Sequence, residues 1–142
     1  MILDSQLLFS DAQAITAAAA STNSVDFGAT KDLGLGESLF IAINVDVAFT
    51  DGGSDSTLTV AVQTDTDPAF GSPTTEAVLT IPALAPIGAA YFVGIDPGVI
   101  AERYARLYYT PNNGNLTTGS ITAAIVKDIQ KQVIYPKGYT IV

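Results

Sequence analysis

Few residue types in this chain could carry out catalytic chemistry. The sequence contains no His, the commonest general base and transition-metal ligand, and no Cys, the thiolate nucleophile and metal ligand. Serine–histidine triads, cysteine nucleophiles, thiolate zinc sites and iron–sulfur clusters are therefore excluded. Trp, the best aromatic platform for a cation, is also absent. We expect that this protein is not an enzyme and uses no cofactor.

Acidic side chains are gathered in two predicted loops that flank one strand. Calcium takes about six to eight oxygen ligands, and the positions of these carboxylates do not follow the EF-hand spacing. Asp is also common in turns, where its carboxylate accepts backbone N–H groups. We favour the turn interpretation and assign no metal site, with calcium binding as the open alternative. The four residues are Asp51, Asp55, Asp65 and Asp67.

A stripe of basic and aromatic residues follows one predicted strand: Arg103, Tyr104, Arg106 and Tyr108. Aromatic rings beside arginines can stack nucleic-acid bases, and both residue types are also enriched in protein interfaces. The chain has 14 acidic and 6 basic residues and a net charge of −8, which repels phosphate backbones. We therefore expect a protein interface and no binding to nucleic acid, with ordinary strand packing as the alternative.

Charge is distributed unevenly along the chain. Residues 1–102 carry 13 of the 14 acidic residues and one base, whereas residues 103–142 carry five bases and one acid. The C-terminal bases include Lys127 and Lys131, which add to the two arginines of the stripe. This asymmetry predicts an electrostatically oriented docking surface. The alternative is that strands of opposite charge lie side by side within the monomer.

Alternation of apolar and polar residues, typical of half-buried strands, is the strongest structural signal. In residues 38–50, the apolar positions from Leu39 to Phe49 all fall on one face. Similar runs recur at short intervals, separated by turn residues such as Asn113-Gly114. We predict an all-β fold, a jelly-roll β-sandwich of about eight antiparallel strands. Its predicted core comprises Leu39, Ile41, Ile43, Val45, Val47, Leu58, Val60, Val62, Leu79, Ile81, Leu107, Ile121 and Ile125.

The length of 142 residues suits a single jelly-roll domain, residues 1–142, with two extended terminal arms. We place the N-terminal arm at residues 1–24 and the C-terminal arm at residues 129–142. The alanine-rich segment Asp11–Ala20 fits either a helix or an extended arm, and we favour the extended form.

Both terminal arms are rich in apolar residues, and segments of this kind dock on a sheet or on a partner. Together with the charged fraction of only 14%, they predict self-association, with a homodimer favoured over a trimer. The alternative is that both arms fold back on their own domain. No stretch has the pattern of a secretion signal or a membrane span, so we expect no membrane partner. The candidate interface residues in the arms are Ile2, Leu3, Leu7, Leu8, Phe9, Val133, Ile134, Tyr135 and Tyr139.

Three segments, Met1–Thr16, Val60–Phe70 and Arg103–Tyr109, carry a resemblance to a known family. In the same order, they resemble segments of the capsid cement (decoration) proteins of tailed bacteriophages, whose best-known member comes from a Bordetella podovirus. The resemblance implies a structural jelly-roll protein that binds the major capsid protein on the outer surface of the virion. It also implies self-association and the bridging of neighbouring capsid subunits. Such a protein is made in the cytoplasm of the bacterial host and has no catalytic residues.

Two other functions remain open at this point. A carbohydrate-binding jelly-roll module of a fibre or spike would need an exposed aromatic platform, and the chain offers six Tyr and no Trp. A small carboxylate-dependent hydrolase would need a close buried pair among the 14 acidic residues.

Overall fold

The computed structural model describes residues 3–28, 38–96, 98 and 100–129. Over these residues the chain forms one 3₁₀ turn and nine β-strands. In chain order they are η1 (Ser5–Leu7), β1 (Leu8–Ala14), β2 (Ala19–Ala20), β3 (Val25–Asp26), β4 (Leu39–Thr50), β5 (Thr57–Asp65), β6 (Thr74–Ile81), β7 (Ala90–Ile95), β8 (Tyr104–Asn112) and β9 (Thr118–Val126).

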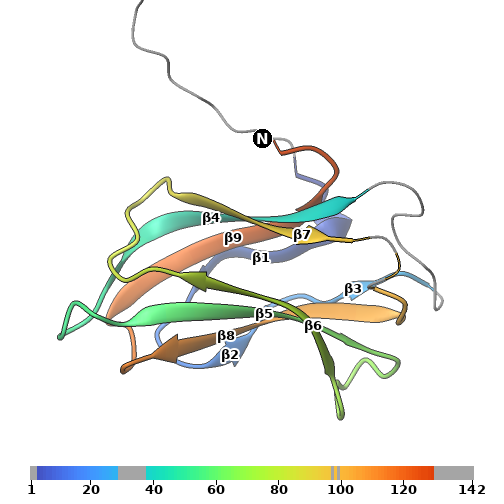
Figure 1. The fold of residues 1–142 in the computed structure, drawn as a ribbon, viewed down its shortest axis with the longest axis horizontal. Helices are drawn as coiled ribbons and strands as arrows, with labels where there is room; N and C mark the ends of the chain where they lie inside the picture. Colours follow the sequence, from blue (N-terminus) through green and yellow to red (C-terminus); the bar gives the residue numbers. More distant parts are fainter. Residues whose placement is uncertain (1–2, 29–37, 97, 99, 130–142) are drawn as a thin grey trace, which may run out of the picture.

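Two antiparallel sheets lie face to face (Figure 1). The first, called sheet A, has the strand order β1-β9-β4-β7, and the second, called sheet B, has the order β2-β8-β5-β6, with β3 also paired to β8. Strands pair from the outside of the sequence inwards: β1 with β9, β2 and β3 with β8, β4 with β7, and β5 with β6. Nested pairs shared between two sheets are the topology of a jelly roll, so the predicted fold class is confirmed.

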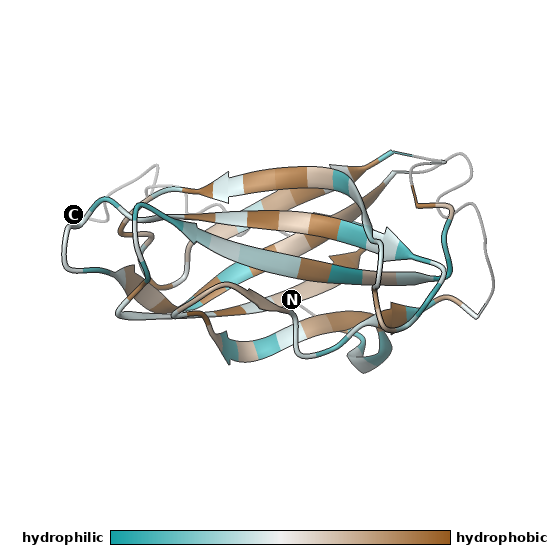
Figure 2. Cartoon of the chain, turned by 90° about the horizontal axis from the view of Figure 1, so that it is seen from below, coloured by the Kyte–Doolittle hydropathy of each residue, from teal (hydrophilic) through white to brown (hydrophobic). Residues whose placement is uncertain are grey.

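Alternating burial explains why these segments form strands. On β5, Leu58, Val60 and Val62 are fully buried, whereas the residues between them are only half-buried. The apolar and polar bands that alternate along the strands in Figure 2 show the same period. Because successive side chains of a strand point to opposite faces, each sheet presents one apolar face to the other. The core between them includes Phe9, Ile15, Ile41, Ile43, Val45, Phe49, Leu58, Val60, Val62, Ile81, Leu107, Tyr109, Ile121 and Ile125.

The predicted core is wrong at Val47, which is 49% exposed. The pairing of β4 with β9 shifts register on both sides of this residue. Such β-bulges interrupt the alternation and turn a side chain away from its expected face. Leu39 and Leu79, also assigned to the core, are half-buried and pack against it.

The N-terminal segment expected as an arm is built into the sandwich. Asp11–Ala20 is extended rather than helical: β1 forms the edge of sheet A, and the chain then crosses to β2 in sheet B. Phe9 and Ile15 are fully buried in the core. Of the predicted C-terminal arm, the structure describes only Ile129, which is 42% exposed.

A buried polar network holds this N-terminal crossing. The Ser10 hydroxyl donates to Gln13 Oε1 at 2.7 Å and lies 2.7 Å from the Tyr109 hydroxyl. Since the single Ser10 proton is used by Gln13, Tyr109 is the donor to Ser10. Gln13 then donates from Nε2 to the Ala20 carbonyl at 2.9 Å and accepts from the Thr22 N–H at 2.9 Å. The network therefore connects β8 of sheet B with β1 of sheet A.

The contrast between two valines on β4 gives a test of the core. Val45 is 2% exposed and Val47 is 49% exposed. Val45→Ala should lower the free energy of unfolding by about 2 kcal/mol, through lost apolar burial and a cavity. Val47→Ala should change it by less than about 0.5 kcal/mol, as expected for an exposed site. Urea unfolding measures both values, and equal losses would contradict the bulge at Val47.

The buried phenol of Tyr109 predicts a pH dependence of stability. Burial raises the pKa of Tyr109, although the hydrogen bond with Ser10 partly opposes this. At neutral pH, Tyr109→Phe should lower the free energy of unfolding by about 0.5–1.5 kcal/mol, the net value of one hydrogen bond.

A pKa that is higher in the folded state gives stability that is fully present below the unfolded value, about 10 for Tyr, and is lost at higher pH. The stability gap between wild type and Tyr109→Phe should therefore close as the pH rises above about 10. Urea unfolding between neutral and alkaline pH checks this, and a gap that stayed constant would refute the role given to Tyr109.

Candidate protein interface on sheet B

The predicted basic-aromatic stripe lies on the outer face of sheet B, the face turned away from sheet A. On β8, Ala105 and Leu107 are fully buried in the core. The alternating positions Tyr104, Arg106 and Tyr108 are half-buried and face outwards. Arg103 directly precedes the strand and is also half-buried. The structure thus brings together the four residues that the sequence pattern had grouped.

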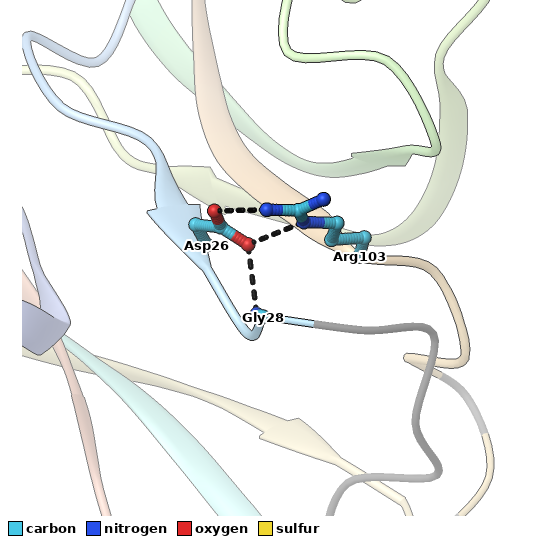
Figure 3. A network of polar contacts seen from close by, with 3 residues as sticks. All are labelled: Asp26, Gly28 and Arg103. Carbon is cyan, nitrogen blue, oxygen red and sulfur yellow. Dashed lines mark hydrogen bonds and ion pairs between the residues drawn. The ribbon is translucent and has the colours of Figure 1, made fainter.

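Arg103 is neutralised within the monomer (Figure 3). Its Nε and Nη2 donate to the two carboxylate oxygens of Asp26 on β3 at 2.8 and 2.9 Å, and the Gly28 N–H donates to Asp26 at 2.8 Å. Hydrogen bonds from Arg103 and then from Gly28 lower the pKa of Asp26. This pair joins β3 to β8, as the alternative interpretation of the charge asymmetry expects.

Arg106 is held by rings and by an amide instead of a carboxylate. Its guanidinium carbon lies 4.3 Å from the centroid of the Phe70 ring and 5.6 Å from that of Tyr108. Its Nε donates to Gln63 Oε1 on the neighbouring strand β5 at 2.9 Å. Within the described residues, Arg106 forms no ion pair, and its two terminal nitrogens have no hydrogen-bond partner.

The loop between β5 and β6 places Phe70 against Arg106. Asp65 accepts the N–H groups of Asp67 and Ser72 through its two carboxylate oxygens at 3.0 and 3.2 Å. The Phe70 N–H donates to the Asp67 carbonyl at 3.0 Å, and Phe70 has a φ of 51°. Backbone hydrogen bonds, first from Asp67, lower the pKa of Asp65, and the charge of Arg106 adds to this effect.

The second acidic loop is also a turn. Asp51 Oδ2 accepts the N–H groups of Gly53, Asp55 and Ser56 at 3.2–3.3 Å and the Ser56 hydroxyl at 2.8 Å. Burial raises the pKa of Asp51, but these hydrogen bonds, first that of the Ser56 hydroxyl, lower it by more. The described residues contain no group of three or more His, Cys, Asp or Glu that could hold a metal ion. Three of the four loop aspartates, Asp51, Asp65 and Asp67, thus accept backbone N–H groups in the way of turn-formers.

The candidate residues of the arms are dispersed. Leu3, Leu7 and Leu8 are half-buried, and Leu7 packs against the core. Phe9 is 0% exposed, so its assignment to an interface is corrected: it fills the core of its own domain. Lys127 is exposed and directly follows β9 of sheet A. The remaining candidates, Ile2, Lys131, Val133, Ile134, Tyr135 and Tyr139, lie outside the described residues.

An apolar strip on the outer face of sheet A was not predicted. In one cross-strand row, Ala42 and Ala124 lie between Leu8 and Phe92. Both alanines are 1% exposed but lie outside the core between the sheets. Phe40 pairs with Val126 and Gly94, and its ring lies 3.7 Å from the position of a Cβ on Gly94. We call this set, Leu8, Phe40, Ala42, Phe92, Ala124 and Val126, the sheet A strip.

Sequence reasoning also missed the partners of the two arginines: Asp26, Gln63 and Phe70. Asp26 and Gln63 are recognised only once the strand register is known, because each lies on a strand paired with β8. The predicted acidic loop of Asp65 and Asp67 marked the region of Phe70 but did not reveal the contact of its ring. In the described part of the chain, no helix is long and apolar enough to cross a membrane.

Comparisons with known proteins bear mainly on the family. No curated protein matches the chain. The exported protein XepA of PBSX shares 13% identity at a TM-score of 0.46, with 95% of this chain and 41% of that one covered. A structure of the Gx strain of infectious bursal disease virus shares 12% identity at a TM-score of 0.44, with 84% and 30% covered. The chain thus spans less than half the length of either protein.

The sequence model of the Bbp16 family matches residues 9–125. This range covers all nine strands of the described fold except the first residue of β1 and the last of β9. It contains the stripe on β8, the two partners Asp26 and Gln63, and the loop of Phe70. The chain belongs to the Bbp16 family.

Proposed function

We propose that this protein is a structural decoration (cement) protein of a bacteriophage virion, which binds the outer capsid surface and bridges neighbouring major capsid subunits. The observation that carries the proposal is the match to the Bbp16 family over residues 9–125. That range contains the segments Val60–Phe70 and Arg103–Tyr109, which resemble the cement proteins of tailed phages.

The distribution of side-chain roles supports a structural function. Asp26, Asp51 and Asp65 are all engaged in ion pairs or backbone hydrogen bonds that shape loops and strand ends. The interior between the sheets is filled by apolar side chains and the Tyr109 network. Among the described residues, the outer faces of the two sheets carry the stripe on sheet B and the sheet A strip, which we propose as contact surfaces. With one surface for a second copy of the chain and one for the shell, a dimer would present two stripes to neighbouring capsid subunits.

Self-association is part of the proposal, with a homodimer ahead of a trimer. The sheet A strip is its proposed contact surface because the half-buried Phe40 and Phe92 lie there beside two buried alanines, and none of its six residues is charged. Aromatic side chains and a lack of charge are typical of the centre of a protein interface. The stripe on sheet B then remains available for the shell.

The alternative of a carbohydrate-binding module has less support. A sugar platform needs an open aromatic face, but the rings of Tyr104 and Tyr108 already lie under the guanidinium groups of Arg103 and Arg106. No described feature favours this function over decoration.

Binding to purified shells tests the proposal directly. The protein, mixed with empty shells of its own phage that lack it, should co-sediment with them to a saturating, fixed number of copies per shell. Mass spectrometry should also find it in purified virions, and a glycan array should give no signal. Absence from virions, or no saturable binding to shells, would overturn the decoration role.

Sedimentation velocity of the free protein tests self-association separately. The dimer should have twice the chain mass of 14.7 kDa. A monomer at high micromolar concentration would overturn the dimer while leaving the decoration role intact.

A further inference from the structure

We propose that Arg106 is a preformed receptor for a carboxylate, an Asp or Glu side chain that projects from the shell subunit to which this protein docks. This inference rests on the proposed decoration function and deepens it by naming the contact. A guanidinium offers five N–H donors in a planar fork that matches the two oxygens of a carboxylate. Among the described residues, only the Nε donor of Arg106 has a partner, Gln63 Oε1 at 2.9 Å.

The guanidinium is fixed before any partner arrives. Phe70 and Tyr108 contact it at 4.3 and 5.6 Å from their ring centroids, and Gln63 sets its rotation through the Nε bond. These contacts restrict a long side chain that otherwise loses rotamer freedom on binding. The two terminal nitrogens remain without a partner in the described chain.

Phe70 packs against Arg106 from outside the core. Phe70 is 7% exposed, but it does not belong to the core cluster between the sheets. Its φ of 51° lies in the left-handed region, which is uncommon for residues other than Gly. Asp65 and Asp67 hold the loop in this form through backbone hydrogen bonds. Strained residues that surrounding bonds hold in place cluster at binding sites.

Arg103 provides the internal comparison. It lies three residues before Arg106 and also contacts a tyrosine ring, that of Tyr104, at 4.9 Å. Its Nε and Nη2 both donate to the carboxylate of Asp26, so the monomer itself supplies the carboxylate that Arg103 binds. No described acid forms an ion pair with Arg106, and the charge of Asp65 acts on it without a direct contact. The missing carboxylate is therefore assigned to a partner.

The surroundings of Arg106 suit a protein rather than a nucleic acid. Next to it, Tyr108, Ala61 and Val78 form one cross-strand row on the outer face, and Val78 is 59% exposed. Arg and Tyr are both enriched in binding hot spots, and here they lie beside exposed apolar surface. The net charge of −8 opposes the approach of a phosphate backbone.

A comparison of the two arginines tests the proposal. Arg106→Gln should weaken binding to purified shells at least tenfold, the scale of losing a hot-spot residue. Arg106→Lys keeps the charge but loses the fork and much of the stacking, so it should weaken binding by several-fold. The matched control Arg103→Gln removes an arginine that Asp26 already satisfies, and it should change shell affinity by less than about threefold. Circular dichroism and thermal unfolding verify that each variant is folded.

Each outcome of this experiment has a definite meaning. If wild type binds shells and both Arg106 variants bind equally well, the carboxylate receptor is refuted while the decoration function stands. If the wild-type protein does not bind shells, the decoration function and the carboxylate receptor are both refuted. Higher salt should weaken wild-type binding more than that of Arg106→Gln, because only wild type has the ion pair. Fluorescence anisotropy with single- and double-stranded DNA should show no binding. DNA binding that is lost in the Arg106 variants would refute the carboxylate receptor and identify a phosphate as the ligand of Arg106.

Discussion

The buried hydrogen bond from the Tyr109 hydroxyl to Ser10 ties the N-terminal segment across the sandwich. It joins the two sheets inside the core, where an unpaired hydroxyl would cost about 1–3 kcal/mol. Ser10 in turn positions Gln13, whose amide binds the chain on the far side of the crossing at Ala20 and Thr22. Residues that follow this crossing can then pair with β8.

One part of the outer face of sheet B, the surroundings of Arg103, depends on this crossing. Because the chain returns along β8, β3 brings Asp26 beside Arg103 and neutralises it. On the other side of β8, β5 brings Gln63 beside Arg106, and an amide oxygen cannot neutralise a guanidinium. Arg103, just before β8, and Arg106, on it, therefore differ in whether a carboxylate compensates their charge. The reason lies in strand register rather than in local sequence.

Alternation in the sequence was enough to predict the all-β jelly roll, since inward positions such as Val60 and Leu107 are fully buried. Alternation failed at Val47, where a bulge breaks the period. The sequence favoured an extended N-terminal segment but did not place it in the sandwich, because the burial of Phe9 and Ile15 depends on pairing with a strand distant in sequence, β9.

The candidate site was predictable in one half only. The stripe could be found from the basic and aromatic residues of a single strand. The difference between the two arginines could not be predicted. Their partners Asp26, Gln63 and Phe70 come from three other segments that only the fold brings together. The loop aspartates show the same limit, since turn and metal interpretations differ only in what the carboxylates contact.

A cryo-electron microscopy reconstruction of the decorated particle tests the central claim most directly. The account predicts density for this jelly roll on the outside of the shell, at junctions between neighbouring capsid subunits, with the outer face of sheet B against the shell and Arg106 opposite a carboxylate. Density that lies inside the shell, that contacts a single subunit only, or that turns sheet B towards solvent would contradict it.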